Sequence, residues 1–209
     1  MRLIGTCFLS ARGLMMDGKL ICQFSDENWL KEAYGMLQVD YPKFYKMDNL
    51  SKMAFICTEQ LKTTGYFENL SDEEMALIFA NSCASQHTDM KFIHSYTEQS
   101  NPSPSLFVYT LPNIVTGELA IRNKWYGSNC FYILPTFDAN FFVNKLQHLK
   151  EEDGNFCLCG WVESKLDATG VIELEESFLF LVSLNEIDKE GSLINQLQET
   201  LTDYRNFKI

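Results

Sequence analysis

The run Met75-Ala-Leu-Ile-Phe-Ala80 is followed at once by the small polar turn Asn81-Ser-Cys-Ala-Ser85 and by the helical spacing of Thr88–Thr97. Six consecutive apolar residues suit a central strand that is covered on both faces. A buried strand, a tight turn and a helix, in this order, are typical of α/β folds. We therefore expect a sheet with helices packed on both of its faces.

Five apolar runs along the chain predict the strands of that sheet. They are Arg2–Ser10, Met75–Ala80, Cys130–Leu134, Phe156–Val162 and Ser177–Leu184. A shorter run, Lys19–Phe24, is also compatible with a strand, whereas Glu163–Gly170 is polar and is expected to be a loop. Amphipathic segments alternate with the strands, and Asn49–Lys62 is the clearest of them. The predicted class is α/β, with a mixed five-stranded sheet in a single domain over residues 1–209.

Composition excludes several classes of protein. The 209 residues carry 17 Lys and Arg against 28 Asp and Glu, a formal net charge of −11, which disfavours nucleic acids and anionic membrane surfaces as partners. No stretch approaches the ~18 apolar residues of a membrane span, and no secretory signal is visible. The seven cysteines lie mostly in apolar runs, as expected for a cytoplasmic protein.

Neither a metal nor a cofactor is expected. The one close cysteine pair, Cys157 and Cys159, is separated by a single residue, which is too short for a zinc knuckle, and no second pair completes a site. There is no Gly-rich phosphate loop. The acidic stretch Glu173–Glu176 is expected to be a solvated hairpin, because nothing nearby in the sequence converges on it.

Several motifs between residues 41 and 163 match one known pattern. Lys46-Met-Asp-Asn-Leu-Ser-Lys-Met-Ala54 is similar to a K-M-D-x-x-S-x-M-A helix start, and Gly127-Ser-Asn129 is similar to a G-P-N element. The other matching pieces are Ser103-Pro104, Leu111-Pro-Asn113, Gly117-Glu-Leu-Ala-Ile121 and Phe156-Cys-Leu-Cys-Gly160. Together these motifs resemble the N-terminal half of β-ketoacyl-ACP synthases, which have the thiolase-like fold.

The catalytic elements of that family are missing from the resemblance. The family's nucleophilic Cys lies in an elbow after the G-P-N element, and counting from Gly127 and Asn129 places Thr136 there. A Thr hydroxyl is a poor nucleophile unless a base activates it. The family also has a C-terminal half that supplies two active-site His, and the histidines of this chain are His87, His94 and His148. The resemblance therefore implies the architecture of a ketosynthase half without its machinery.

Cys83 is a second candidate for a nucleophile. It lies in a strand-to-helix turn, and His87 or His94 could supply a base. The alternative is a structural role, because the resemblance places this turn at the family's dimer interface, beside the end of the partner's acyl tunnel. On that reading the side chains that would line or gate the tunnel are Cys83, Ala84, Met90, Phe92 and Leu106.

The resemblance also implies a partner. The run Cys130, Phe131, Tyr132, Ile133 and Leu134 matches the strand that pairs with its counterpart across the family's dimer axis, and an apolar edge strand should not be left bare. We predict a non-catalytic, chain-length-factor-like subunit of an active ketosynthase in fatty-acid, polyketide or aryl-polyene-type synthesis. Acyl-ACP would bind only indirectly, since carrier proteins are also acidic. The alternatives are an acyltransferase that uses Cys83 and a homodimeric acyl-binding module.

Overall fold

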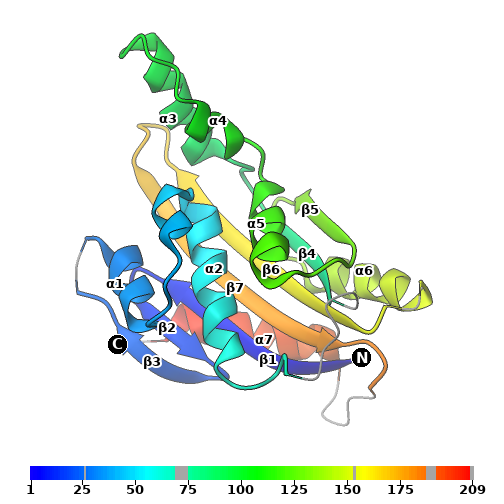
Figure 1. The fold of residues 1–209 in the computed structure, drawn as a ribbon. Helices are drawn as coiled ribbons and strands as arrows, with labels where there is room; N and C mark the ends of the chain where they lie inside the picture. The colour runs from blue at the N-terminus through cyan, green and yellow to red at the C-terminus, as the bar shows by residue number, and fades with distance from the viewer. Residues whose placement is uncertain (26, 69–74, 153, 187–191, 208–209) are drawn as a thin grey trace.

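The computed structural model describes residues 1–25, 27–68, 75–152, 154–186 and 192–207, and within them seven strands form one mixed sheet (Figure 1). The strand order is β3-β2-β1-β7-β6-β4-β5. The strands are β1 (Arg2–Ser10), β2 (Gly13–Met16), β3 (Lys19–Gln23), β4 (Met75–Asn81), β5 (Asn129–Ile133), β6 (Phe156–Leu166) and β7 (Ile172–Ser183). The predicted α/β class is confirmed.

Five of these strands are the predicted ones, and β3 matches the shorter run Lys19–Phe24 that was compatible with a strand. With β2 the described sheet has seven strands in place of the predicted five. β4 pairs in parallel with both β5 and β6, whereas β7 runs antiparallel to β6 and to β1. The hairpin β2–β3 extends the sheet beyond β1 through antiparallel pairs such as Cys7↔Met16. β2 was not predicted, because its four residues are too few to establish a period of two.

Helices cover both faces of the sheet, as predicted (Figure 1). On one face, α1 (Trp29–Met36), α2 (Asn49–Lys62) and α5 (Ile114–Asn123) bury a core that includes Phe55 and Phe79. On the other face, α6 (Ala139–Glu151) and α7 (Leu193–Asn206) bury a second core around Phe142 and Phe180. A 3-10 turn, η1 (Pro42–Lys46), precedes α2. None of the helices described is long and apolar enough to span a bilayer.

Two further helices project beyond the sheet. α3 (Gln86–Thr97) and α4 (Pro104–Val108) pack on each other and extend away from the strands (Figure 1). We call α3, α4 and the segment between them the arm. Its tip is held together by Phe92, whose ring lies 5.5 Å from those of Tyr96 and Phe107.

The expected loop at 163–170 is wrong over its first half. β6 continues through Glu163 to Leu166 and pairs with β7, and the turn occupies the residues that follow. The Asp167 carboxylate accepts hydrogen bonds from the backbone N–H groups of Thr169 and Val171, which closes a tight hairpin. Glu163 and Ser164 are polar because their side chains enter a buried network, whereas Lys165 faces solvent.

Candidate functional site

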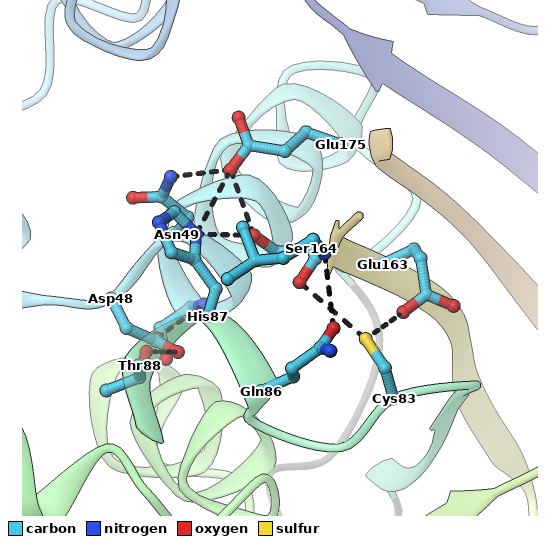
Figure 2. A network of polar contacts seen from close by, with 11 residues as sticks. Asp48, Asn49, Cys83, Gln86, His87, Thr88, Glu163, Ser164 and Glu175 are labelled. Carbon is cyan, nitrogen blue, oxygen red and sulfur yellow. Dashed lines mark hydrogen bonds and ion pairs between the residues drawn. The ribbon is translucent and has the colours of Figure 1, made fainter. Parts of the chain in front are cut away.

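The predicted site residues Cys83, Ala84 and Thr136 lie at the carboxyl ends of β4 and β5, beside the end of β6. Because these three strands are parallel, the segments that follow them meet at the same end of the sheet, where the strands end. Ligands and active sites of open α/β sheets form at this end. Here it holds the 81–85 turn, the 134–138 segment and the end of β6, and a polar network connects the first and last of them (Figure 2).

The turn after β4 is rigidly hydrogen-bonded. The buried Asn81 side chain accepts from the Ala84 N–H at 2.9 Å and donates to the Ala84 carbonyl at 2.8 Å. Ala84 has a φ of +52°, a left-handed conformation that costs about 1 kcal/mol for a residue with a Cβ. The Ser85 hydroxyl reaches across to the Thr110 carbonyl. The turn is thus held in a single shape against its own strain.

Cys83 lies in this turn and donates its thiol hydrogen to a buried carboxylate. Its Sγ is 2.8 Å from Oε1 of Glu163 (Figure 2). The other carboxylate oxygen accepts from the Ser82 N–H at 2.8 Å. Burial, followed by the neighbouring Glu163, raises the pKa of Cys83 to about 12. Because the thiolate is the nucleophile, this environment opposes nucleophilic chemistry at neutral pH.

Neither histidine proposed as a base for Cys83 is bonded to it. The Nδ1 atom of His87 is hydrogen-bonded to the Ser164 hydroxyl oxygen at 2.9 Å. That hydroxyl donates to the Glu175 carboxylate at 3.0 Å. His94 pairs instead with Glu98 on the exposed side of α3. Desolvation, with a smaller contribution from Lys91, lowers the pKa of His87 to about 4, so its ring is neutral at pH 7.

The prediction of a solvated acidic hairpin at Glu173–Glu176 is wrong for half of the stretch. Glu173 is exposed and pairs with Lys165, but Glu175 and Glu176 are buried. Glu175 accepts from Asn49 of α2 as well as from Ser164, and Glu176 pairs with Arg205 of α7. Asn49 and Arg205 lie far from this stretch in the sequence, so no local pattern predicted that Glu175 and Glu176 would be buried.

At the expected nucleophile position the structure holds no catalytic arrangement. Thr136 is exposed. The ring of Phe137 packs into the second core, with centroids 5.5–6.4 Å from those of Phe142, Trp161, Phe178 and Phe180. The Asp138 carboxylate accepts from the Asn140 and Phe141 N–H groups at the start of α6. A fixed negative charge therefore occupies the helix terminus that would otherwise favour a thiolate or an oxyanion.

The predicted gating residues are divided between the turn and the arm. Cys83 and Ala84 lie in the turn at the base of the arm, whereas Met90 is 39% exposed along α3 and Phe92 and Leu106 are half-buried farther out. Whether they line an acyl tunnel remains a prediction.

The predicted dimer strand is the last strand of the sheet, and no strand of the described residues pairs with its outer side, which we call the open edge. β5 begins and ends one residue earlier than predicted and is partnered on one side by β4. Ser128 O accepts from Leu77 N, and Leu134 N donates to Asn81 O, so even-numbered residues bond to β4. Alternate residues bond to the same neighbour in a parallel ladder, so the N–H and C=O groups of 129, 131 and 133 face outward. The Ile133 side chain is 52% exposed.

Two other features of the structure do not form part of this site. A hollow of about 1000 Å³ between β1 and α7 lies at the opposite end of the sheet, and its Asp17 and Tyr204 are already bonded to Thr6. Cys157 and Cys159, with Sγ atoms 3.6 Å apart, are buried in the second core. The described residues contain no group of three side chains placed to hold a metal.

The neutral His87 makes stability dependent on pH. Its folded pKa of about 4 lies below the ordinary 6.5, so the unfolded chain is protonated first as pH falls and stability is lost between pH 6.5 and 4. After allowance for solvent at the ring, we expect this loss to reach about 2 kcal/mol. His87→Asn, which keeps a donor for Ser164, should lack that loss. Urea titrations of both proteins at pH 7 and pH 4.5 measure it, and parallel pH curves would contradict the assignment.

Comparison with known proteins gives matches at the level of structure. No protein-family model and no curated protein matches the chain. A ketosynthase in complex with its chain length factor from Xenorhabdus doucetiae aligns with a TM-score of 0.61 at 13% identity, over 99% of this chain and 92% of that one. The ishigamide ketosynthase/chain length factor aligns with a TM-score of 0.59 at 16% identity.

A β-ketoacyl synthase from Burkholderia phymatum STM815 also aligns, with a TM-score of 0.54 at 11% identity. The chain covers 90% and 87% of its own length in the ishigamide and Burkholderia alignments, but 63% and 58% of those two chains. These structural alignments establish the fold, whereas sequence identities this low leave the activity open. The chain therefore has the thiolase-like fold shared by ketosynthase and chain-length-factor subunits.

Proposed function

We propose that this protein is a non-catalytic, ketosynthase-like subunit that pairs with an active β-ketoacyl-ACP synthase. The observation that carries the proposal is the start of α6, where Thr136 is exposed and Asp138 occupies the N–H groups that a nucleophile elbow would use. The partner would supply the Cys and His residues, and acyl-ACP would bind mainly to that partner.

The surface beside this site supports pairing. β5, which carries the open edge, contacts α5. Ile121 of α5, and Tyr126 shortly after this helix, are each about 70% exposed. The arm adds further exposed apolar side chains, namely Met90, Ile93, Tyr96, Phe107 and Val108, and Leu111 lies just after it. Exposed apolar surface of this kind marks protein interaction sites.

Light scattering tests the proposal directly. The purified chain is measured alone and then mixed with a ketosynthase from the same organism. A one-to-one complex that condenses acyl groups only when both subunits are present is the expected result. A stable homodimer that binds none of the organism's ketosynthases would contradict the proposal and favour the homodimeric acyl-binding module.

Product length tests the tunnel role. In the reconstituted pair, truncating Met90, Phe92 or Leu106 to alanine should lengthen the product by at least one condensation, because each variant removes apolar volume from the proposed tunnel end. Mass spectrometry of the released products measures this. If all three variants leave the distribution of product lengths unchanged, the arm does not control chain length.

Thiol labelling tests the alternative in which Cys83 transfers acyl groups. A pKa of about 12 leaves very little thiolate at pH 8. Iodoacetamide should therefore label the exposed Cys130 at least ~30-fold faster than Cys83, since the loss of thiolate is only partly offset by higher intrinsic nucleophilicity. Peptide mapping by mass spectrometry separates the two sites. Fast labelling of Cys83, with acyl transfer that Cys83→Ser abolishes, would favour the alternative.

A further inference from the structure

Three residues near the end of β6 hold the base of the arm. Glu163 accepts from the Ser82 N–H and from the Cys83 thiol, both at 2.8 Å. Ser164 bonds to His87, and the Leu166 N–H donates to Gln86 at 3.1 Å. We call Glu163, Ser164 and Leu166, with these four partners on the turn and α3, the β6 clamp. Figure 2 labels its Cys83, Gln86, His87, Glu163 and Ser164.

The clamp is well placed to set the direction of the arm. α3 begins at Gln86, inside the clamp, and its 12 residues extend about 18 Å beyond it (Figure 1). A rotation of about 10° at the base would move the far end of such a helix by about 3 Å. Displacement on that scale is enough to misplace the exposed apolar side chains that α3 and α4 carry.

Glu163 is the central residue of the clamp. Its side chain is fully buried and both of its carboxylate oxygens are used, one for the backbone of the turn and one for Cys83. The turn that it holds begins at Asn81, which pairs with Ile133 at the end of β5. The same carboxylate therefore fixes the arm relative to the open edge of the sheet.

We propose that Glu163 is a positioning residue that aligns the arm with the β5 edge, so that the two form one preorganised docking surface for the partner subunit. This inference rests on the proposed function and adds to it the group that sets the geometry of the interface. Preorganisation raises affinity because the ordering of the surface does not have to occur on binding. A residue that served only to stabilise the fold would not affect the affinity of a folded variant.

Three variants separate positioning from stability. Glu163→Ala removes both hydrogen bonds, whereas Glu163→Gln keeps the length and an acceptor oxygen for the Ser82 N–H. Glu173→Ala is the matched control, because Glu173 lies on the same hairpin but pairs only with the exposed Lys165 among the contacts described. Amide hydrogen exchange of residues 86–108 in the isolated chain reports the arm, and exchange of 172–183 reports the fold. Titration with the ketosynthase gives the affinity.

We expect Glu163→Ala to speed exchange of the arm about tenfold and to weaken the complex about tenfold, with β7 unchanged. Glu163→Gln should stay within threefold of the wild type, and Glu173→Ala should equal it. If Glu163→Ala does not fold, Gln86→Ala deletes one bond of the clamp and should weaken the complex about threefold.

The possible failures are distinct. A wild-type chain that binds no ketosynthase contradicts the proposed function. If the wild-type chain binds the ketosynthase and Glu163→Ala, or Gln86→Ala in its place, binds it equally tightly, the inference alone is overturned. Unchanged hydrogen exchange of the arm in the variant would overturn it as well.

Discussion

Replacing Ile133 with proline is expected to weaken the complex with the ketosynthase at least ~100-fold. The Ile133 N–H faces away from β4, so proline removes a hydrogen bond to a partner strand without breaking one inside this chain. Proline is tolerated on edge strands for that reason. The side chain is half exposed, so its loss costs the isolated chain little. Affinity measured by titration calorimetry tests the prediction.

Ile133→Thr is the matched control for this experiment. Threonine keeps the outward N–H and the β-branched shape that favours a strand. We expect its affinity to remain within a few-fold of the wild type and both variants to keep the unfolding free energy of the parent within about 1 kcal/mol. Equal affinities of the proline and threonine variants would show that backbone pairing along β5 does not form the interface.

Replacing Gly127 with alanine is expected to lower the unfolding free energy by about 3 kcal/mol. A Cβ at this position would lie 2.4 Å from the carbonyl oxygen of Met75 and 2.7 Å from its carbonyl carbon. Both are backbone atoms at the start of β4, and they cannot move aside without disturbing the pairing of β4 with β5. Urea denaturation measures the loss.

Gly117→Ala is the control for this second prediction. Gly117 lies within α5, and a Cβ there meets no atom within 4 Å. Alanine is a better helix former than glycine, so stability should rise by about 0.5–1 kcal/mol. A Gly127→Ala protein as stable as the parent would mean that β4 and the 127–129 turn can separate without cost.

Strands with long apolar runs were predictable from sequence. β4, the first part of β6 and the later part of β1 are mostly apolar because both of their faces are buried, and hydrophobicity alone identifies such strands. The fold class followed from their alternation with amphipathic helices. The extension of β6 was missed because Glu163 and Ser164 look solvated when their distant partners are unknown. The hairpin turn at Asp167–Gly170, between two strand-like segments, was a local signal that could have indicated it.

The candidate site was predictable only in part. The turn containing Cys83 was found from the order of strand, turn and helix, whereas the assignment of Thr136 to the family's nucleophile position stays a prediction. The carboxylates that surround the turn were not found. Glu163 reaches Cys83 across 80 positions of sequence, and Glu175 reaches Asn49 across 126. Contacts of this range come from the topology of the sheet, which no window of sequence contains.

The start of α6 also bears on how such a protein could evolve. A Thr136→Cys substitution would place a thiol two residues from the Asp138 carboxylate, which already accepts the N–H groups of the first helical turn. The negative charge would raise the pKa of the new thiol, so the single change would give no thiolate and no advantage. Removing Asp138 first would cost the helix its cap, typically about 1 kcal/mol. Under the proposed function, each route to a thiolate at position 136 begins with a step that brings no benefit, so we expect this position to stay without a thiol in descendants of this sequence.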